Sequence, residues 1–393
     1  MEFNVFQNNK TLMKVQEENG WKLYKFDDIL IDDTRNAIKI KKGLYLEYGQ
    51  YPIIDQGKNE IAGYTNEVEG IYKEEALVFG DHTRIIKYID FPIFLGADGV
   101  KLLKLKSNKE KISIKYLYYF LNTVKLPSDG YSRHFKYLKQ IVIPVPKLDI
   151  QMKIVKCMDK ANELIDKRKE QIKTLDELIK SQFIEMFGDP FNDAKGFGTN
   201  KLGEVTGVNP KKAEIKNLDK ELLVSFVPMD RVGEKGEFNP EVSKSIGEVY
   251  SGFTYFREND VLFAKITPCM ENGKGAVAVN LSNGIGFGST EFHVLRPLRE
   301  KSNSYWIYHL TTLIEFRRLA ERKMTGSAGQ KRVPTDFLNN IRVVVPPIEL
   351  QNQFADFVKQ VDKLKFEMEN SLKELEDNFN SLMQKAFKGE LFD

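Results

Sequence analysis

Residues 148–187 read LDIQMKIVKCMDKANELIDKRKEQIKTLDELIKSQFIEMF, and residues 348–387 read IELQNQFADFVKQVDKLKFEMENSLKELEDNFNSLMQKAF. Neither stretch contains glycine or proline, and apolar residues recur in each at alternating spacings of four and three. Of the 20 positions in these two series, 17 are apolar, which is typical of a coiled-coil seam. We therefore expect two helices that end near Gly188 and Gly389, each roughly 55–60 Å long at about 1.5 Å per residue.

The two stretches belong to a longer internal repeat. Residues 138–187 align with residues 338–387 at an offset of 200 without a gap, and ten of the fifty positions are identical. Each copy opens with a β-branched run that ends in proline, which predicts a strand immediately before the helix. The segments upstream also begin alike, with Gly20-Trp21 and Gly196-Phe197. The chain is therefore expected to run domain, helix, domain, helix.

Each long helix must cover an apolar stripe, and the nearest partner for that stripe is the other helix of the same chain. The residues by themselves leave a parallel and an antiparallel pair open. Arg168 and Lys365 occupy seam positions, where a charged side chain fixes the register of a coiled coil at a cost in stability.

Composition indicates an ordinary soluble protein of more than one domain. The 393 residues are 41% hydrophobic and 29% charged, and no apolar run is long enough to span a membrane. The two cysteines, Cys157 and Cys269, are too few for a disulfide framework or a cysteine zinc site, so a cytoplasmic location is expected. The formal net charge of +3 gives weak support for nucleic-acid binding, which must then depend on local basic clusters.

Both globular halves mix short strand-like runs with helical runs, which predicts compact α/β domains. The strand-like runs are 76–79, 100–105, 261–264 and 292–295, the run 305–322 is helical, and 114–121 is either a helix or a buried strand.

Several loops combine glycine with cationic, amide or hydroxyl side chains, which suit base edges and phosphates. The same residue types also occur in ordinary solvated turns. The loops lie at 55–58, 80–84, 96–101, 133–136, 265–274, 288–291 and 326–332.

Motifs for catalysis are missing from the sequence. There is no Walker A loop and no Asn/Asp-Pro-Pro-aromatic motif of an amino-methyltransferase. The acid-x-lysine fragment at 214–216 lacks an acidic partner on a preceding strand, and the glycine-rich stretch 284–288 lacks a following helix and is expected to be a turn between strands. The four histidines, which lack metal-ligand spacing, are His82, His134, His293 and His309.

In these features the chain resembles the specificity subunits of type I restriction-modification systems over essentially its whole length. The resemblance rests on the strings at 79–84 and 96–101 in the first half, and at 263–274 and 288–293 in the second. The two helix starts also match, because Pro146 and Pro346 are each followed five residues later by Gln151 and Gln351.

The resemblance implies an α/β (α+β) fold with two target recognition domains and two long helices packed as an antiparallel coiled coil, related by an internal pseudo-two-fold repeat. On this plan the first recognition domain spans 1–147 with an N-terminal extension at 1–20, to which no role is assigned. The first helix spans 148–189. The second recognition domain spans 190–347 with a connector at 190–200, and the second helix spans 348–393.

The resemblance further implies a non-catalytic subunit that binds double-stranded DNA. Each recognition domain would read one half of a split, asymmetric target, and the helices would set the gap and dock two methyltransferase subunits, through which restriction subunits join. No cofactor or metal is expected on this chain. The expected DNA-contacting residues are His82, Thr83, Arg84, Lys101, Arg133, Lys136, Lys265, Thr267, Asn272, Lys274, Ser289, Thr290, Ser327, Gln330, Lys331 and Arg332.

Two other functions remain as alternatives. A coiled-coil adaptor whose globular domains bind protein would explain the helices, although it leaves the repeated cationic glycine loops unexplained. A stand-alone DNA-cleaving or DNA-modifying enzyme would need a carboxylate cluster or a cofactor loop, and the sequence has neither.

Overall fold

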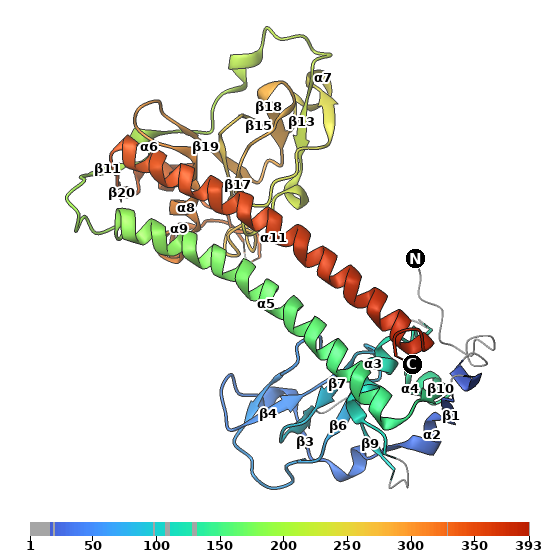
Figure 1. The fold of residues 1–393 in the computed structure, drawn as a ribbon. Coiled ribbons are helices and arrows are strands. Elements are labelled where there is room, and N and C mark those ends of the chain that lie inside the picture. The colour runs from blue at the N-terminus through green and yellow to red at the C-terminus, as the bar shows by residue number, and fades with distance from the viewer. Residues whose placement is uncertain are drawn as a thin grey trace. The chain divides into compact units, whose positions relative to one another are not determined.

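The computed structural model describes residues 16–18, 20–96, 99–106, 111–127, 132–327 and 329–392. The chain divides into two compact units, one of residues up to Lys169 together with those from Asn370 onward, and one of Glu170–Glu369. Each unit contains one globular head and a part of both long helices (Figure 1). Most of the N-terminal extension, positions 97–98 of the first head's glycine loop and position 328 of the last loop lie outside the described residues.

The long helices are α5 (Leu148–Phe187) and α11 (Ile348–Lys388). Gly188 and Gly389 follow with φ of 75° and 77°, the left-handed conformation that glycine adopts most readily after a helix. In the first unit, the beginning of α5 packs with the end of α11 in one apolar core, and in the second unit the end of α5 packs with the beginning of α11. This arrangement confirms the predicted antiparallel pair.

The seam between the helices contains aromatic rings and one ion pair in the second unit. The ring of Phe354 lies 5.4 Å from that of Phe183 and 5.2 Å from that of Phe187, both edge-on. The seam lysine, Lys365, donates from Nζ to Asp176 Oδ1 at 2.7 Å, and both side chains are about one-fifth exposed. A half-buried cross-helix pair of this kind favours one register of the two helices.

The first head contains two four-stranded sheets, with orders β2-β9-β6-β7 and β3-β8-β4-β5, and a two-stranded ribbon, β1-β10. The first sheet is antiparallel throughout. The elements of the first head are β1 (Lys22–Lys25), α2 (Phe26–Ile29), β2 (Leu30–Asp32), η1 (Thr34–Asn36), β3 (Lys39–Ile40), η2 (Lys42–Leu44), β4 (Tyr51–Ile54), β5 (Gly63–Thr65), β6 (Ala76–Gly80), β7 (Ile86–Ile89), β8 (Phe94–Gly96), β9 (Val100–Leu105), α3 (Ile114–Asn122), α4 (Phe135–Leu138) and β10 (Val142–Val145).

The second head repeats this plan with sheets β12-β19-β16-β17 and β14-β13-β18-β15 and the ribbon β11-β20. Its elements are β11 (Thr199–Lys201), α6 (Leu202–Val205), β12 (Thr206–Val208), η3 (Lys212–Ile215), β13 (Leu223–Val227), η4 (Met229–Arg231), β14 (Ser243–Ser245), α7 (Ile246–Val249), β15 (Thr254–Arg257), β16 (Val261–Ala264), β17 (Gly275–Val277), η5 (Ser282–Gly284), β18 (Ile285–Gly288), β19 (Phe292–Pro297), α8 (Ser304–Thr312), α9 (Ile314–Lys323), α10 (Thr335–Asn340) and β20 (Arg342–Val344).

The two heads differ at one edge of the second sheet. In the first head β3 lies at this edge and runs parallel to β8. In the second head β15, which comes later in the chain than the hairpin β13–β14, occupies the edge beside β18 and runs antiparallel to it. The heads therefore share a common sheet core, while this edge is supplied by different segments.

One sequence expectation in the second head is wrong, and another is refined by the structure. Residues 285–288 of the glycine-rich stretch form the strand β18 and not a turn, and Gly284 ends the short helix η5 before it. A Cβ on Gly286 would lie 2.1 Å from the Phe256 ring, so glycine is required for the strand to pack. The run at 305–322 is helical as expected, in two helices, α8 and α9, which Leu313 separates in an extended conformation.

The repeated Pro-x-x-x-x-Gln motif has the same structural role in both units. Gln151 donates from Nε2 to the Pro146 carbonyl at 2.8 Å and accepts at Oε1 from the Ser113 amide at 2.9 Å. Gln351 does the same with Pro346 and Asn303, at 2.8 Å and 2.9 Å. Ser113 and Asn303 are the N-caps of α3 and α8. Each glutamine therefore ties the start of a long helix to the preceding strand and to a helix of the adjacent head.

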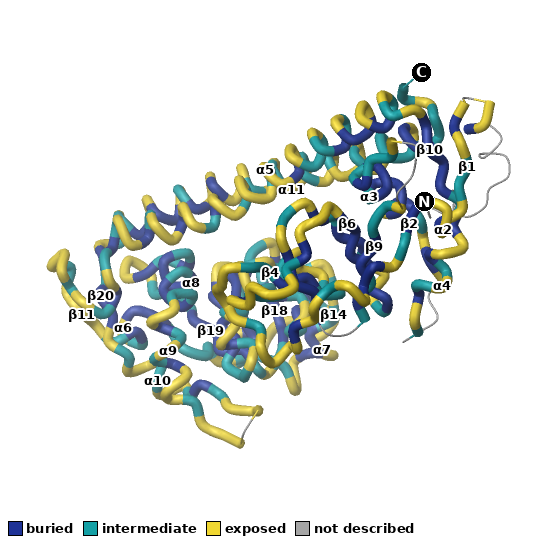
Figure 2. The backbone as a smooth tube through the Cα atoms, turned by 90° about the horizontal axis from the view of Figure 1, so that it is seen from below, coloured by how far each residue is buried: buried dark blue, intermediate teal, exposed yellow. Residues whose placement is uncertain are grey.

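Burial follows the strands of each head and one face of each long helix, whereas exposed residues recur along the other face of α5 and α11 (Figure 2). The head cores include Tyr116, Phe120 and Phe26 in the first unit and Trp306, Phe316 and Phe354 in the second. Within the described part of the chain, no helix is both long enough and apolar enough to cross a bilayer.

Candidate nucleic-acid interface

Three loops of the second head meet in what we call the second-head junction, the backbone meeting point of residues 265, 291 and 333. The Lys265 amide, directly after β16, donates to the Glu291 carbonyl at 2.9 Å. The Val333 amide, before α10, donates to the Lys265 carbonyl at 2.9 Å. The loops at 265–274, 288–291 and 326–332, which are far apart in sequence, therefore come together.

Polar side chains surround this junction. Lys331 donates from its amide to Thr267 Oγ1 at 3.1 Å, and the Thr267 amide donates to the Lys331 carbonyl at 3.1 Å. Arg332 forms a two-pronged ion pair with Glu291, from Nε to Oε2 at 2.9 Å and from Nη2 to Oε1 at 2.8 Å. The hydrogen bond from Arg332 lowers the pKa of the Glu291 carboxyl, so the pair is ionised near neutral pH. Arg332, one of the residues expected to contact DNA, therefore carries a charge that is paired with Glu291 within the protein.

The other expected residues of the second head divide into two groups. Thr290, Ser327, Gln330 and Lys331 are exposed on the loops of the junction, and Ser289 is half-buried there. Asn272 and Lys274 turn away from them, because Asn272 donates to Glu234 Oε1 at 2.9 Å and Lys274 to the Met229 carbonyl at 3.3 Å. The structure thus brings together eight of the ten expected residues of this head, including Lys265, Thr267 and Arg332, and places the side chains of two apart from them.

A hollow of about 230 Å³ lies beside the junction. Its wall includes Lys265 and Lys212, together with Asn209, Thr254 and aromatic side chains. Burial lowers the pKa of Lys212, whose Nζ donates to the Tyr250 carbonyl at 2.8 Å. Two cations in the wall of one hollow attract an anion such as a phosphate.

The first head has a corresponding first-head junction, the meeting point of residues 81, 99 and 134. The Asp81 amide, directly after the β6 strand, donates to the Gly99 carbonyl at 2.7 Å. The His134 amide, before α4, donates to the Asp81 carbonyl at 2.9 Å. These two hydrogen bonds have the same topology as those of the second head, so both heads hold three loops together in the same way with different side chains.

The expected residues of the first head lie around this junction. His82 Nδ1 is 3.2 Å from the Ser132 carbonyl, and Arg84 donates to the Leu126 carbonyl at 3.3 Å. Lys101 is ion-paired with Asp32 at 2.7 Å. Thr83, Arg133 and Lys136 are exposed.

Sequence reasoning missed the residues that hold the loops in place. Asp81 Oδ1 accepts from the Phe135 amide at 2.7 Å, and the buried Lys87 donates to the Asp55 carbonyl at 2.9 Å. Glu291 and Lys212 were also missed. Glu291 could have been found as the one carboxylate of the loop at 288–291, whereas Lys87 lies on a strand with no sign of its role.

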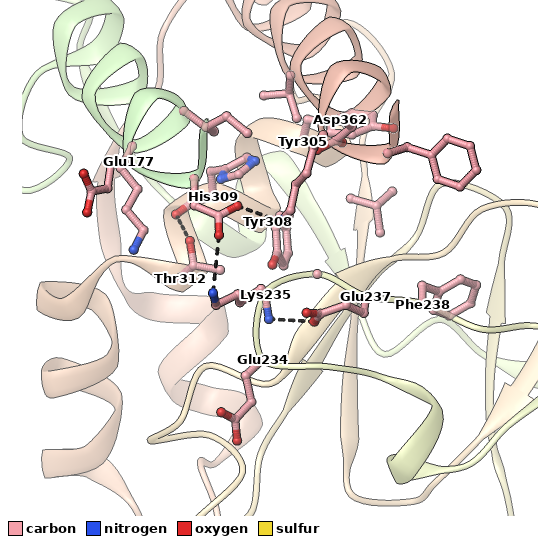
Figure 3. A pocket seen from close by; sticks show the side chains of 18 of the residues that line it. Glu177, Glu234, Lys235, Glu237, Phe238, Tyr305, Tyr308, His309, Thr312 and Asp362 are labelled. Carbon is pink, nitrogen blue, oxygen red and sulfur yellow. Dashed lines mark hydrogen bonds and ion pairs between the residues drawn. The ribbon is translucent and has the colours of Figure 1, made fainter. Parts of the chain in front are cut away.

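A larger cavity of about 560 Å³ lies in the second unit, between the long helices, α8 and the 234–238 loop (Figure 3). Six carboxylates and five cationic side chains line it, and ion pairs such as Lys235–Asp176 at 3.5 Å neutralise part of this charge. Burial lowers the pKa of His309 in its wall to about 3. This mixed charge does not favour a nucleic acid. Among the described residues, no group of three or more His, Cys, Asp and Glu side chains is arranged to hold a metal ion.

Comparisons with known proteins agree on one family. The model of the type I restriction modification DNA specificity domain matches residues 18–175 and 194–377. The EcoEI specificity subunit of Escherichia coli is 38% identical over 179 residues, which cover 45% of this chain and 29% of that protein. The putative MjaX specificity subunit of Methanocaldococcus jannaschii is 23% identical over 394 residues, which cover 88% of this chain and 87% of that protein.

A solved structure supports the same fold. A chain from work on complex assembly and conformational transition of the type I R-M system aligns with a TM-score of 0.55 at 16% identity, over 94% of this chain and 98% of that chain. The family match covers both halves of the sequence and most of its length. The chain therefore belongs to the family of type I restriction-modification DNA specificity subunits, as its sequence resemblance predicts.

Proposed function

We propose that this chain is the non-catalytic subunit that selects the DNA target of a type I restriction-modification complex, with each head reading one half of a split, asymmetric site. The observation that carries this proposal is the shared junction. Asp81–Gly99–His134 and Lys265–Glu291–Val333 have the same backbone hydrogen bonds but different side chains. A common scaffold with different side chains suits two different half-sites.

The exposed cations and amides around the two junctions supply both kinds of DNA contact. Arg84, Arg133 and Lys331 are exposed and suited to phosphates or base edges. Binding through phosphates falls steeply with salt, because each neutralised phosphate releases counterions. The modest net charge of +3 is consistent with a complex in which methyltransferase subunits contribute part of the affinity for DNA.

The long helices are proposed to set the unread gap between the half-sites and to dock two methyltransferase subunits, through which restriction subunits join. Leu164 and Leu364, which correspond at the repeat offset of 200, are 48% and 42% exposed on α5 and α11. Met152, Ile184 and Phe366 are also exposed on these helices. Apolar side chains at equivalent positions of a duplicated helix favour two equivalent partners.

The test is to co-express the chain with its cognate methyltransferase subunit and to sequence methylated bases in the host DNA. Methylation at one split, asymmetric motif that disappears when this chain is omitted is the expected result. An exchange of residues 22–145 for the first head of a relative with a known target is the matched control, because it is expected to change one half of the motif and leave the other.

Other outcomes would count against the proposal. A stable complex without motif-specific methylation would contradict target selection. If no complex forms with the methyltransferase, the protein-binding adaptor becomes the better explanation of the long helices.

A further inference from the structure

The Arg332–Glu291 pair differs in one respect from the other two-pronged arginine pair of the second head. Arg296 binds Asp260 with Nε and Nη2, both at 2.7 Å, and Glu214 with Nη1 at 2.7 Å. Its side chain is 21% exposed, and Asp260 is 2% exposed. Arg296 therefore joins elements inside the head. Arg332 makes the same side-on pair, but its side chain is 41% exposed.

The hydrogen bonds of Arg332 leave part of its guanidinium free. Of its five N–H groups, one on Nε and one on Nη2 bind Glu291, and one on Nη1 donates to the Gln330 carbonyl at 3.1 Å. One N–H on Nη1 and one on Nη2 have no acceptor among the described residues. These two nitrogens form the terminal fork of the guanidinium, which matches the O6 and N7 acceptors of guanine in the major groove.

The backbone beneath this pair is fixed on both sides. The Arg332 amide donates to the Thr325 carbonyl at 2.8 Å, and the Thr325 amide donates back to the Arg332 carbonyl at 3.0 Å. Glu291 is held through its carbonyl, which accepts from Lys265, and through its amide, which donates to Ser289 Oγ at 3.2 Å. An arginine held at both backbone and side chain loses little conformational entropy when it binds a base.

A carboxylate inside a DNA-binding surface repels phosphates unless it has another role. Glu291 is 26% exposed and lies among Lys265, Lys331 and Arg332, where its charge offsets part of their attraction for DNA. This electrostatic cost is explained if Glu291 serves to hold Arg332 in one orientation. At the corresponding point of the first-head junction stands Gly99, which has no carboxylate.

We propose that Arg332, oriented by Glu291, reads a guanine in the half-site contacted by the second head. Arg332 makes the base contact, and Glu291 is a positioning residue that acts through it. The inference rests on the proposed function, because it assigns chemistry within that interface. It also restricts this device to one head, since Gly99 stands at the position equivalent to Glu291 and the Asp81 carboxylate of the first-head junction accepts from the Phe135 amide instead.

The test is selection of bound sequences from a randomised DNA pool by the assembled complex with methyltransferase subunits. The wild-type complex is compared with Arg332→Lys, Glu291→Gln and Lys331→Ala. Arg332→Lys keeps the charge but loses the fork, so the preference for guanine at one position is expected to fall about 10- to 100-fold with the other positions unchanged. Glu291→Gln is expected to weaken the preference at that same position by a smaller factor.

Lys331→Ala is the matched control. Lys331 is the exposed neighbour of Arg332, and its ammonium makes no hydrogen bond or ion pair among the described residues. Its loss is expected to weaken binding to all sequences alike and to reduce the salt dependence by about one phosphate contact.

Three results would overturn the inference. If the wild-type complex selects a motif, but Arg332→Lys weakens the preference for guanine at none of its positions, the base contact is refuted and the proposed function stands. A uniform loss of affinity in Arg332→Lys would mark a phosphate contact. If Arg332→Lys weakens the preference for guanine and Glu291→Gln leaves it unchanged, the positioning role of Glu291 is refuted. A wild-type complex that selects no motif would instead refute the proposed function itself.

Discussion

Replacement of Gln351 by methionine should destabilise the second unit while leaving the size of the side chain nearly unchanged. Gln351 is fully buried and makes three hydrogen bonds, to Asn303, Pro346 and Lys301. Methionine leaves one amide and two carbonyls without these partners. At about 1 kcal/mol for each, the low end of the range for an unsatisfied buried group, the loss is about 3 kcal/mol in the free energy of unfolding.

The assay is urea unfolding combined with hydrogen exchange of a peptide that covers 301–312. The Asn303 amide should exchange faster in the variant, because its acceptor is Gln351 Oε1. Gln353→Met is the matched control, since Gln353 is exposed on the same turn of α11, and it should change the free energy of unfolding by less than about 0.5 kcal/mol. Equal destabilisation by the two variants, or continued protection of the Asn303 amide, would refute the reasoning.

Three further predictions concern the helices and the cavity. Phe354→Ala should cost about 3–5 kcal/mol in the free energy of unfolding, since its fully buried ring packs on three others, whereas Phe366→Ala on the same helix should cost far less in the same urea titration. The low pKa of His309 keeps its imidazole neutral in the folded protein, whereas in the unfolded chain it gains a proton below about pH 6.5. The free energy of unfolding should therefore fall as pH drops below about 6.5, by at most about 1.4 kcal/mol per pH unit. His309→Phe should flatten this slope in pH-dependent unfolding, and an unchanged slope would contradict the prediction. Leu164→Asp and Leu364→Asp should each weaken binding of one methyltransferase subunit in a pull-down without lowering the thermal midpoint, and normal two-to-one assembly by both variants would count against docking there.

The long helices could be predicted because their signal is periodic and local. The spacing of Ile154, Met158 and their successors specifies a buried stripe, and the second copy specifies its partner. The relative direction of the two helices could not be derived from that spacing, because it depends on which end of each helix packs into the core of which head. Phe387 packs on Tyr116 and Phe120 of the first head, with ring centroids 5.5 Å and 5.6 Å apart, contacts that span more than 260 residues of sequence.

The candidate interface was only partly predictable, because loop composition indicates residue types and not partners. Lys101 and Arg332 were expected to contact DNA, but the sequence did not show that each pairs with a carboxylate, because Asp32 and Glu291 lie 69 and 41 residues away. The stretch at 284–288 misled for a similar reason. Glycine there makes room for the Phe256 ring, which no local pattern reveals.

The ribbons β1-β10 and β11-β20 have a consequence for how such a chain can change. Lys22 lies opposite Val145, and Thr199 lies opposite Val344, so each head leaves the helical frame and returns to it on neighbouring antiparallel strands. Everything between the two strands of a ribbon can then be exchanged as a cassette, as long as the paired ends and the glutamine that follows are kept. If each head reads one half-site, as proposed above, genetic recombination between related chains at these junctions would give new combinations of half-sites in a single step, with the helical frame unchanged.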